Sequence, residues 1–323
     1  MSVQCGLCPK HCLISEGQSG ECRIRVNRGG KLLATTYGRP CSVHLDPIEK
    51  KPLFHMLPGT AILSIATVGC NLHCKNCQNW QISQRNPEDS AAYRLAPKEI
   101  PALARRNNCR SVAYTYTEPA VYYEYALDSA IAVREAGLKN VLVTAAYINK
   151  EPWRELCRHV DAANIDLKSM RDDFYRDVCG ATLKPVLDAL VGAKEAGVMV
   201  EVTNLVIPRM NDSEKDLKSL AEWICANLGA ETPLHFSRFH PQHLMRHLPP
   251  TPADTLERAR GIATAAGLKH VYVGNILSKD GENTYCPDCG KLLLRRSRYT
   301  VSENHVVAGK CKYCQSEVYG IWK

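Results

Sequence analysis

Short apolar segments alternate with longer amphipathic segments through the middle of this chain. The apolar segments have the length of buried strands and occupy residues 61–67, 111–115, 140–144, 162–166, 198–204, 234–237 and 270–273. Segments of helical length lie between them, at residues 97–108, 119–137, 150–160, 185–197, 211–228 and 252–267. Strands that alternate with helices of about ten or more residues are typical of parallel βα units. Six or seven such units predict an α/β fold built as a partial barrel.

The ends of the predicted helices carry matching local signals. Pro97 stands at the start of one helix, and Gly137 and Gly197 follow the ends of two others. Proline suits the first helical position, and glycine suits the position after the last. The sequence Asn211-Asp-Ser-Glu214 offers side chains that can cap the first turn of a further helix. These signals support the alternation of strands and helices.

The two ends of the chain do not follow this alternation. Residues 1–24 contain Pro9, Gly17, Gly20 and four cysteines, which predict a tight loop-rich knot without helix or strand. Residues 38–52 combine prolines with mixed charges and are predicted to be a linker. The predicted domains are an N-terminal cysteine-rich metal-binding region with its linker at 1–55, a barrel at 56–280 and a C-terminal four-cysteine module at 281–323.

The composition excludes several protein classes. The chain has 323 residues, 45 % of them hydrophobic, and a formal net charge of +8, as expected for a globular protein with a sizeable core. No apolar run could span a bilayer and no secretory signal is visible, so we expect a cytoplasmic protein without a membrane partner. Basic residues are dispersed, so no specific nucleic-acid partner is expected. In a reducing compartment the 16 cysteines favour metal ligation over disulfides.

Polar residues follow nearly every predicted strand. Carboxyl ends of parallel strands meet at one rim, where the catalytic residues of such folds lie, so these residues are expected to be neighbours. In chain order they are Cys70, Cys74 and Cys77; Tyr116, Thr117 and Glu118; Thr144; Asp166 and Lys168; Asn204; Arg238 and His240; Gly274 and Asn275. An active site would need such a rim, whereas a structural metal site would not.

The CxxxCxxC spacing of Cys70, Cys74 and Cys77 indicates an iron–sulfur site. Three thiolates can hold three irons of a 4Fe–4S cube, and the fourth iron stays open because no fourth cysteine follows closely. An open iron can bind the amino and carboxylate groups of S-adenosylmethionine (SAM) and pass one electron to its sulfonium. A zinc site or a structural iron–sulfur site is the alternative that three cysteines alone would allow.

Further motifs surround the central cysteines in one order along the chain. They are Cys5-x-x-Cys8-Pro9, Asp46 to Pro52, Gln78-Asn-Trp80, Tyr114 to Pro119, Asn164 to Lys168, Ser237 to Pro241 and Gly281 to Pro287. Together with the CxxxCxxC motif they resemble the AmmeMemoRadiSam-system radical SAM enzymes, relatives of pyruvate formate-lyase activating enzyme. The resemblance covers essentially the whole chain. It implies a partial (β/α)6 radical SAM barrel with the cluster and SAM inside its top.

The resemblance also implies roles for single residues. Thr117 and Glu118 stand where the family has its GGEP segment, which receives the methionine ammonium of SAM. Lys168 stands where the activating enzymes contact the SAM carboxylate, and Asp166 where they have a cation ligand. His240 resembles a histidine that approaches the SAM ribose. Asn204 is expected to face SAM as well.

Two positions depart from the family pattern. An aromatic residue usually precedes the third cysteine of the motif, and this chain has Asn76 there, with Trp80 as a candidate replacement. The third strand commonly ends in Thr-Asn-Gly, and here Thr144 is followed by two alanines. A cation site built on that loop would lack the side-chain amide.

Two further sets of four cysteines predict bound metal. The C-terminal set consists of Cys286, Cys289, Cys311 and Cys314. Its paired CxxC motifs are typical of a zinc-ribbon or rubredoxin-like module, and we favour zinc over iron there. The N-terminal set consists of Cys5, Cys8, Cys12 and Cys22, which suit either zinc or an iron–sulfur cluster. Buried thiols without a ligand are expected at Cys41, Cys109, Cys157, Cys179 and Cys225.

The sequence therefore predicts a radical SAM enzyme, an oxidoreductase-like protein with a 4Fe–4S cluster. By the resemblance, it cleaves SAM reductively to a 5′-deoxyadenosyl radical that abstracts hydrogen from a substrate, which can be a protein. A glycyl-radical-enzyme activase is the alternative enzyme, and an iron–sulfur electron carrier or scaffold is the non-enzyme alternative. Expected partners are SAM, an electron donor such as flavodoxin or ferredoxin, and the other two proteins of the AmmeMemoRadiSam system.

Overall fold

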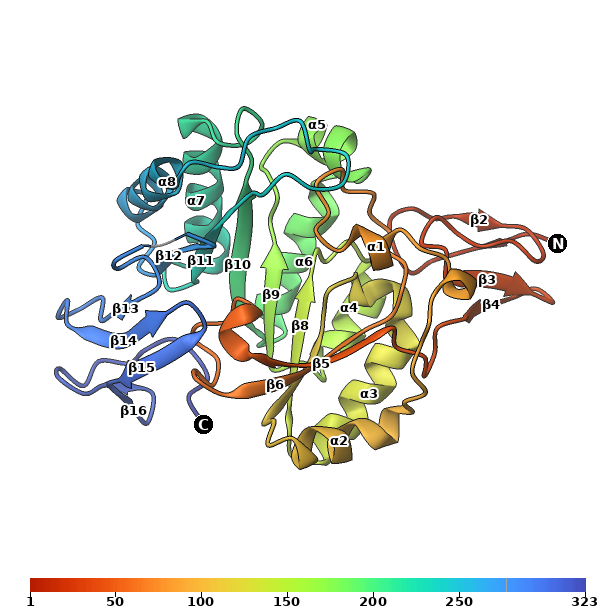
Figure 1. The fold of residues 1–323 in the computed structure, drawn as a ribbon, viewed down its shortest axis with the longest axis horizontal. Helices are drawn as coiled ribbons and strands as arrows, with labels where there is room; N and C mark the ends of the chain where they lie inside the picture. Colours follow the sequence, from red (N-terminus) through yellow and green to blue (C-terminus); the bar gives the residue numbers. More distant parts are fainter. Residues whose placement is uncertain (277) are drawn as a thin grey trace.

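An eight-stranded sheet forms the centre of the molecule. The structure is a computed structural model that describes residues 1–276 and 278–323. The strands of the sheet are β5 (Ser42–Pro47), β6 (Ala61–Ala66), β7 (Ser111–Tyr114), β8 (Lys139–Thr144), β9 (Ala162–Asp166), β10 (Met199–Val206), β11 (Leu234–Arg238) and β12 (Val271–Gly274). They lie side by side in chain order, from β5 at one edge to β12 at the other (Figure 1). Strands β6 to β12 are parallel, and β5 pairs antiparallel with β6.

Helices in the crossovers cover one face of this sheet. They are α2 (Ile100–Arg106), α3 (Tyr123–Glu135), α4 (Lys150–Cys157), α6 (Lys184–Glu195), α7 (Glu214–Leu228) and α8 (Ala253–Ala265). Right-handed crossovers between consecutive parallel strands bring all of these helices to the same side. Their apolar residues join those of the strands in one continuous core. The predicted α/β fold with a mostly parallel sheet is confirmed, and its description as a barrel stays a prediction.

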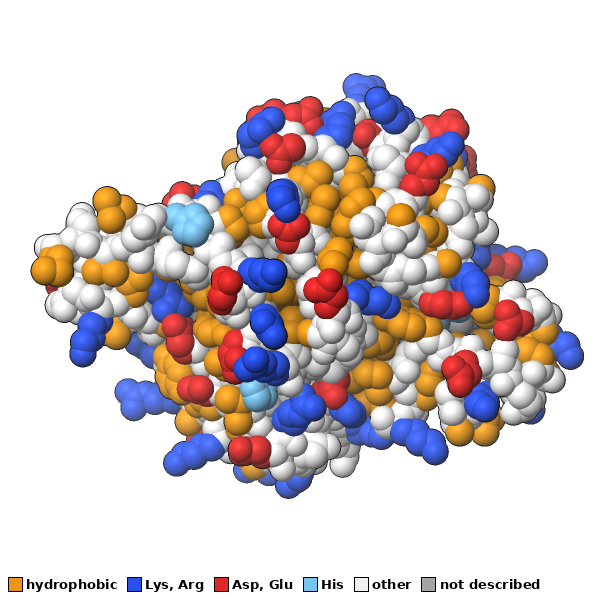
Figure 2. Space-filling model, turned by 180° about the vertical axis from the view of Figure 1, so that it is seen from behind, with side chains coloured by type: hydrophobic (Ala, Val, Ile, Leu, Met, Phe, Trp, Pro, Cys, Tyr) orange, Lys and Arg blue, Asp and Glu red, His pale blue; other side chains and the backbone are white. Residues whose placement is uncertain are grey.

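The helix-covered side of the molecule has a mixed surface. Figure 2 shows acidic, basic and hydrophobic side chains interspersed on the face opposite to the view of Figure 1. No helix of the part of the chain that the structure describes has both the length and the apolar character needed to cross a membrane.

The prediction that residues 38–52 form a linker is wrong. This segment contains β5 and the short turn η1 (Ile48–Lys50), and β5 pairs with β6 from Ser42 opposite Ala66 to Pro47 opposite Ala61. The buried positions of β5 include Ser42 and Asp46, whereas Leu45 is exposed. Polar residues therefore occupy buried positions of this strand, where hydrophobic residues are usual. For this reason the sequence pattern does not indicate a strand here. The predicted boundaries of the three domains stay predictions.

The N-terminal residues form two small antiparallel pairs that project from one side of the sheet (Figure 1). The first pair is β1 (Val3–Gln4) with β2 (Leu13–Ile14), and the second is β3 (Arg25–Arg28) with β4 (Lys31–Ala34). Residues 1–24 are mainly loops, as predicted, but the prediction that they contain no strand is wrong. Strands of two residues are too short to leave a periodic pattern in the sequence.

The C-terminal module is a small β structure that contacts the edge of the sheet near β12 (Figure 1). Its strands are β13 (Thr284–Tyr285), β14 (Leu292–Ser297), β15 (Thr300–Asn304), β16 (Val306–Val307) and β17 (Lys310–Cys311). Buried Arg296 donates a hydrogen bond of 2.6 Å to the carbonyl of Phe54, just before β6. The N–H of Ile321 donates to the carbonyl of His55 at 2.7 Å. These contacts fix the module to the sheet.

A helical segment that the sequence did not indicate follows β9. It consists of α5 (Asp172–Phe174) and the π-helical turn η5 (Tyr175–Cys179). The turn ends at Gly180, whose φ of +64° suits glycine. Its last residue, Cys179, is fully buried. The segment thereby brings a fourth thiol toward the loop of the central cysteines.

Candidate active site

One large cavity lies at the carboxyl ends of the parallel strands. Its volume is about 830 Å³. All of the residues predicted for the rim line it except Asn204: Cys70, Cys74, Cys77, Tyr116, Thr117, Glu118, Thr144, Asp166, Lys168, Arg238, His240, Gly274 and Asn275. The cavity therefore collects groups from the ends of β6, β7, β9 and β11, as expected for a functional site of this architecture.

The loop after β6 carries the central cysteines and is held by backbone hydrogen bonds. The N–H of His73 donates to Cys179 at 2.9 Å, and the N–H of Lys75 donates to Val178 at 2.9 Å. The loop is thus anchored to η5. Cys70 and Cys74 are buried, and Cys77 is partly exposed. A rigid loop presents the three thiols to the cavity in a fixed arrangement.

Local charges and hydrogen bonds distinguish the three thiols. The hydrogen bond from Cys179 and the nearby ammonium of Lys168 lower the pKa of Cys74, despite its burial. Burial and the carboxylate of Glu118 raise the pKa of Cys70 well above its usual value. Burial also raises the pKa of Cys77, whose sulfur lies 3.3 Å from Ser83 Oγ. Metal binding would remove the protons from the buried thiols.

Cys179 lies beside the loop of the central cysteines, a neighbour that sequence reasoning missed. The sequence predicts a buried thiol there, and the structure adds that this thiol lies near Cys74 and helps to lower the pKa of Cys74. The two residues are far apart in the chain and meet only because η5 folds back on the loop after β6. A single-sequence pattern carries no signal for such a contact.

The carboxylate of Glu118 is buried at the end of β7 and accepts three hydrogen bonds. The donors are Thr144 Oγ1 at 2.5 Å and the N–H groups of Ala145 at 2.7 Å and Ala120 at 3.2 Å. Burial nonetheless raises its pKa. Thr117 is fixed as well, since its hydroxyl donates to the carbonyl of Thr67 at 2.8 Å. Thr144 thus orients Glu118.

Lys168 and Asp166 form an ion pair beside the cysteines. The ammonium lies 2.8 Å from a carboxylate oxygen of Asp166, and the lysine side chain is 17 % exposed. Burial alone would lower the pKa of Lys168, but Asp166, Cys74 and Cys179 raise it well above its usual value. Lys168 therefore stays a cation next to the thiols.

Asn204 and His240 differ in their relation to the cavity. Asn204 is not among the residues that line the cavity, and its expected contact with SAM stays a prediction. Its amide donates to the carbonyls of Leu167 at 2.7 Å and Lys168 at 3.2 Å and so shapes the loop after β9. His240 is exposed at the rim of the cavity.

Asn76, which departs from the family pattern, and Trp80, its candidate replacement, differ in their relation to the cavity. Asn76 is buried and lines it. Trp80 opens α1 (Trp80–Ser83) and stacks on His243, with ring centroids 5.3 Å apart. Trp80 is not among the lining residues, so it does not replace an aromatic residue at position 76.

A second charged group lines the cavity away from the cysteines and was missed by sequence reasoning. Lys51 donates to Asp46 at 2.6 Å, and the hydroxyl of Tyr116 also donates to Asp46. Burial lowers the pKa of Lys51 to about 8. Hydrogen bonds from Lys50, Lys51 and Tyr116 lower the pKa of Asp46 although burial acts in the opposite direction. Asp46 belongs to β5, in the segment that the sequence predicts to be a linker.

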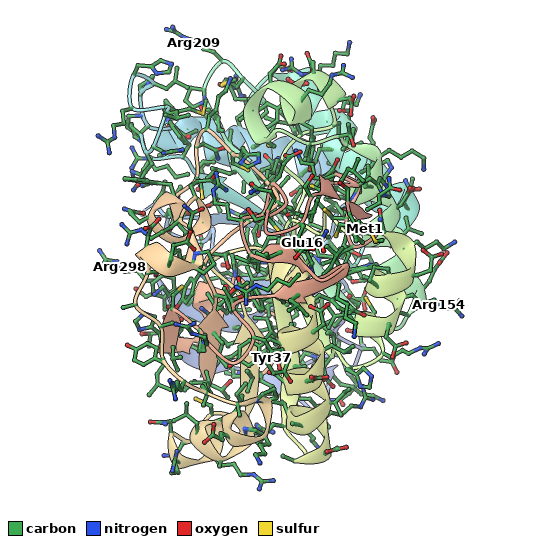
Figure 3. All side chains as sticks on the ribbon, turned by 90° about the vertical axis from the view of Figure 1, so that its right-hand side faces the viewer. Met1, Glu16, Tyr37, Arg154, Arg209 and Arg298 are labelled. Carbon is green, nitrogen blue, oxygen red and sulfur yellow. The ribbon has the colours of Figure 1, made fainter. Side chains whose placement is uncertain are left out.

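The C-terminal module contributes to the wall of the cavity. Glu282, Arg298 and Tyr299 line it from the side of β14 and β15. Arg298 lies at the edge of the molecule in the side view of Figure 3. A ligand that fills the cavity would therefore contact this module as well as the sheet.

The four C-terminal cysteines are arranged for a single ion. Their sulfur atoms all lie within 4.8 Å of one another. Cys286 and Cys314 are 3.6 Å apart between sulfurs, and Cys289 and Cys311 are 3.7 Å apart. A tetrahedral zinc with bonds of about 2.3 Å places its sulfur ligands about 3.8 Å apart. The residues present fit such an ion.

The N-terminal cysteines line a separate small cavity. Its wall includes Cys5, Cys8, Cys12 and Cys22, together with Asn71 from the loop of the central cysteines. Burial raises the pKa of Cys8 to about 11 and also raises that of Cys22. These thiols, like the central ones, would lose their protons on binding a metal.

Comparisons with known proteins identify the family. A family model described as the radical SAM superfamily matches residues 64–224. An uncharacterised protein of Methanocaldococcus jannaschii is 48 % identical over 318 residues, which cover 98 % of this chain and 95 % of that protein. The pyruvate formate-lyase-activating enzyme of Clostridium pasteurianum is 25 % identical over 162 residues, 48 % of this chain and 66 % of that enzyme. The crystal structure of Streptococcus suis SuiB bound to S-adenosylmethionine has a similar fold, with a TM-score of 0.54 at 14 % identity over 71 % of this chain and 53 % of SuiB.

Proposed function

The chain belongs to the radical SAM superfamily, and from this premise we propose that Cys70, Cys74 and Cys77 hold the 4Fe–4S cluster of an enzyme that removes hydrogen from a substrate. A 4Fe–4S cluster and reductive cleavage of SAM follow from the family. The cluster and SAM supply the radical chemistry, and the protein supplies their binding and orientation.

The observation that carries this proposal is the convergence of three cysteines, a buried carboxylate and a lysine on one cavity. A structural metal site would need the cysteines alone, so the charged groups that line the same cavity support a catalytic cluster rather than a structural ion.

The cavity offers SAM acceptors and donors together. Glu118 and the backbone before it would receive the ammonium, and the Lys168 ammonium would bind the carboxylate as a compact point charge. Asp166 would hold Lys168 in place. The distance of 2.8 Å between the lysine ammonium and a carboxylate oxygen of Asp166 supports this role. His240, at the rim, would lie near the ribose. Asn204 would act indirectly, because its amide holds the loop that carries Lys168.

Asp166 has a second candidate role, that of a cation ligand. Its carboxylate is 37 % exposed and has oxygen atoms to spare beyond the contact with Lys168. Thr144 would not serve such a site, because its hydroxyl is engaged by Glu118. The proposal for Asp166 is therefore primarily the orientation of Lys168.

The C-terminal cysteines would hold structural zinc. The short module has a core of five buried residues, Cys286, Leu293, Leu294, Cys311 and Val318, two of which are cysteines of this set. A metal would tie together the loops between β13 and β17. Since the module lines the cavity, its metal would act on the active site through the position of Arg298 and Tyr299.

A glycyl-radical-enzyme activase is the second candidate. Relatives include the activating enzyme of benzylsuccinate synthase in Thauera aromatica, 26 % identical over 136 residues. The large cavity is compatible with a peptide segment as substrate. Partners on either proposal are SAM, a flavodoxin or ferredoxin as electron donor, and the other two proteins of the AmmeMemoRadiSam system.

The experiment that tests the proposed function uses anaerobically purified, reconstituted protein. The EPR signal of the reduced cluster is recorded with and without SAM, and candidate partner proteins are then treated and analysed by mass spectrometry. We expect a signal that SAM changes and that disappears when Cys70, Cys74 and Cys77 are replaced by alanine. An unchanged signal in that variant would show that the cluster lies elsewhere. A stable glycyl radical on a partner would identify the activase.

A further inference from the structure

Part of the wall of the large cavity is not used by the proposed contacts to SAM. It consists of η1, the following Lys51 and the residues of the C-terminal module that line the cavity. In Figure 1, β14 and β15 lie on one side of strands β8 to β10, and α1, which follows the central cysteines, lies on the other. This part of the wall is therefore available to a second ligand beside SAM.

Two lysines of this wall share a single carboxylate. The ammonium groups of Lys50 and Lys51 lie 2.8 and 2.6 Å from the two carboxylate oxygens of Asp46. Both lysines line the cavity, and the side chain of Lys51 is only 2 % exposed. The ammonium of Lys51 also lies 4.5 Å from the ring centre of Tyr116. The cluster keeps one positive charge that no carboxylate offsets, and Lys51 is held firmly at the cavity.

Arg298 adds a second cation to the same wall. On its hairpin, Arg295 pairs with Glu303, and Arg296 lies 3.9 Å from Glu49. The guanidinium of Arg298 has no ion pair within the part of the chain that the structure describes, although this residue lines the cavity. In Figure 3, Arg298 and Arg154 of helix α4 lie at opposite edges of the view. Arg298 is therefore on the side of the sheet that the crossover helices leave open.

The carboxyl groups of this wall offset the cations only in part. Glu49 is buried beside Arg296, and its Oε1 accepts a hydrogen bond from the N–H of Gly59 at 2.8 Å. Glu282 accepts a hydrogen bond of 2.8 Å from the backbone N–H of Arg298. Burial raises the pKa of both carboxyl groups. Since Arg296 matches Glu49, only Glu282 opposes the charges of the two lysines and Arg298.

The backbone of Arg298 suits another kind of residue. Ser297 pairs with Thr300, so Arg298 and Tyr299 form a two-residue hairpin loop between β14 and β15. The φ of Arg298 is +54°, and hairpin loops of this length favour glycine, asparagine or aspartate where φ is positive. Side chains held in such costly conformations cluster at binding and active sites. The hairpin itself would gain from glycine here, so the arginine points to a role in the cavity.

Buried contacts fix the hairpin against the segment that follows Lys51. Arg296 donates to the carbonyl of Phe54 at 2.6 Å and to Thr284 Oγ1 at 2.7 Å. The guanidinium of Arg296 also lies over the ring of Phe54, 4.3 Å from its centre. The two segments that carry Lys51 and Arg298 are therefore anchored to each other, and both cations face one space.

We propose that Lys51 and Arg298 form an anion-binding subsite of the cavity, which takes the carboxylate or phosphate group of the substrate. That the ligand is the substrate rests on the proposed function, whereas anion binding does not. A guanidinium offers parallel N–H donors to two oxygens, and an ammonium supplies a compact positive charge. Lys168 is separate from this subsite, because it is paired with Asp166 beside the central cysteines. The enzyme would thus act on an acidic substrate.

The test titrates the full chain anaerobically with pyrophosphate and, separately, with malonate, each with and without saturating SAM. Isothermal titration should show saturable binding of at least one probe, and the tighter probe identifies a phosphate or a carboxylate ligand. In Arg298→Gly and in Lys51→Met, the Kd should rise roughly ten- to hundredfold, because a charge-assisted contact is lost. No saturable binding of either probe to the parent would overturn the proposal.

Arg298→Gly separates binding from folding. Glycine suits the positive φ of this position, so the variant should unfold at a temperature no lower than that of the parent. It keeps the test decisive if Lys51→Met fails to fold. Arg295→Ala is the control, since it removes a guanidinium from the same hairpin but outside the cavity, and it should bind the probes like the parent. Equal Kd values for the parent and Arg298→Gly, or equal losses in Arg295→Ala and Arg298→Gly, would overturn the subsite.

Lys168→Ala distinguishes the subsite from the proposed SAM site. This variant should bind the probes like the parent, and saturating SAM should not displace them. Loss of probe binding in Lys168→Ala, or displacement by SAM, would place the anion at the SAM site and overturn the proposal. A parent that binds a probe but does not cleave SAM would contradict the proposed function and leave the subsite supported. A parent that cleaves SAM and binds neither probe would do the reverse.

Discussion

The ammonium of Lys168 lies 2.8 Å from a carboxylate oxygen of Asp166, two residues earlier at the end of β9. Both residues line the cavity that also contains Cys74, and the lysine charge lowers the pKa of that thiol. Lys168 is therefore shared between a carboxylate, a thiol and any carboxylate-bearing ligand. Lys168 therefore connects the binding of such a ligand to the loop that carries the central cysteines.

Removing a proposed SAM contact should weaken SAM binding without loss of iron. In Lys168→Ala and in Glu118→Gln, a charge-assisted contact is lost, which costs about 1.5–3 kcal/mol, or roughly a ten- to hundredfold rise in the Kd for SAM. Iron content is expected to stay normal, because neither residue is a proposed iron ligand. Isothermal titration of the reconstituted proteins with SAM measures the effect.

The matched control for Lys168 is Lys184, whose ammonium lies 2.7 Å from a carboxylate oxygen of Asp188 on the surface of α6. Lys184→Ala should bind SAM like the parent. If Lys168→Ala and Glu118→Gln also bind SAM like the parent, the assignment of the ligand contacts is wrong.

Gly69 should tolerate no side chain. A Cβ at this position would approach the Cys22 carbonyl to 2.5 Å and Ile24 to 2.6 Å, and the φ of +89° disfavours other residues. Gly69→Ala is expected to lower the free energy of unfolding by about 1–3 kcal/mol and to reduce cluster loading. Gly137→Ala is the control, because φ is +73° there and a Cβ would meet no atom within 4 Å. Equal effects of the two variants would show that the contact with Cys22 is unimportant.

The buried amine of Lys51 should make stability depend on pH. Burial lowers its pKa to about 8 from 10.5, so between these values the unfolded chain binds more protons and stability rises with pH. From pH 7 to pH 9 the parent should gain about 1 kcal/mol relative to Lys51→Met. Urea unfolding under anaerobic conditions measures this difference.

Lys50→Met is the control for this pH dependence. Lys50 also pairs with Asp46, at 2.8 Å, but its side chain is 45 % exposed. The variant retains Lys51, so its stability should follow pH as that of the parent does. If the stability of the parent and that of Lys51→Met changed with pH in parallel, the effect assigned to Lys51 would be contradicted.

Removing the C-terminal metal site should lower both zinc content and stability. In Cys286→Ser combined with Cys314→Ser, two of four ligands are lost, so about one zinc per chain should disappear. The module should then unfold at a lower temperature than in the parent, because metal binding contributes to folding. Cys225→Ser, at a thiol outside the three cysteine sets, is the control. A zinc-free parent with the same thermal unfolding as the zinc-loaded one would refute a structural metal.

Local patterns were sufficient to predict most of the fold. The strand after residue 61 and the helix before Gly137 appear in the structure as β6 and α3, because runs of apolar residues and caps are determined locally. The sequence does not reveal β5 because this strand buries two polar residues, Ser42 and Asp46. A search for alternating buried hydrophobic residues cannot detect such a strand. Edge strands often differ from interior strands in this way.

The candidate site was predictable where residues follow strand ends. Glu118 and Lys168 line the cavity because parallel strands bring their carboxyl ends together. Cys179 and Lys51 were missed because they reach the site through tertiary contacts between segments. Asn204 lies within β10, and its amide donates to a carbonyl of the loop after β9.

The central claim is that the cluster of Cys70, Cys74 and Cys77 cleaves SAM. It is tested most directly by incubating the reduced, reconstituted parent with SAM and measuring 5′-deoxyadenosine by mass spectrometry. We predict that the parent forms 5′-deoxyadenosine and that the Cys70→Ala, Cys74→Ala, Cys77→Ala variant forms none. A parent with an intact, reduced cluster that forms no 5′-deoxyadenosine would contradict the claim and favour an iron–sulfur electron carrier.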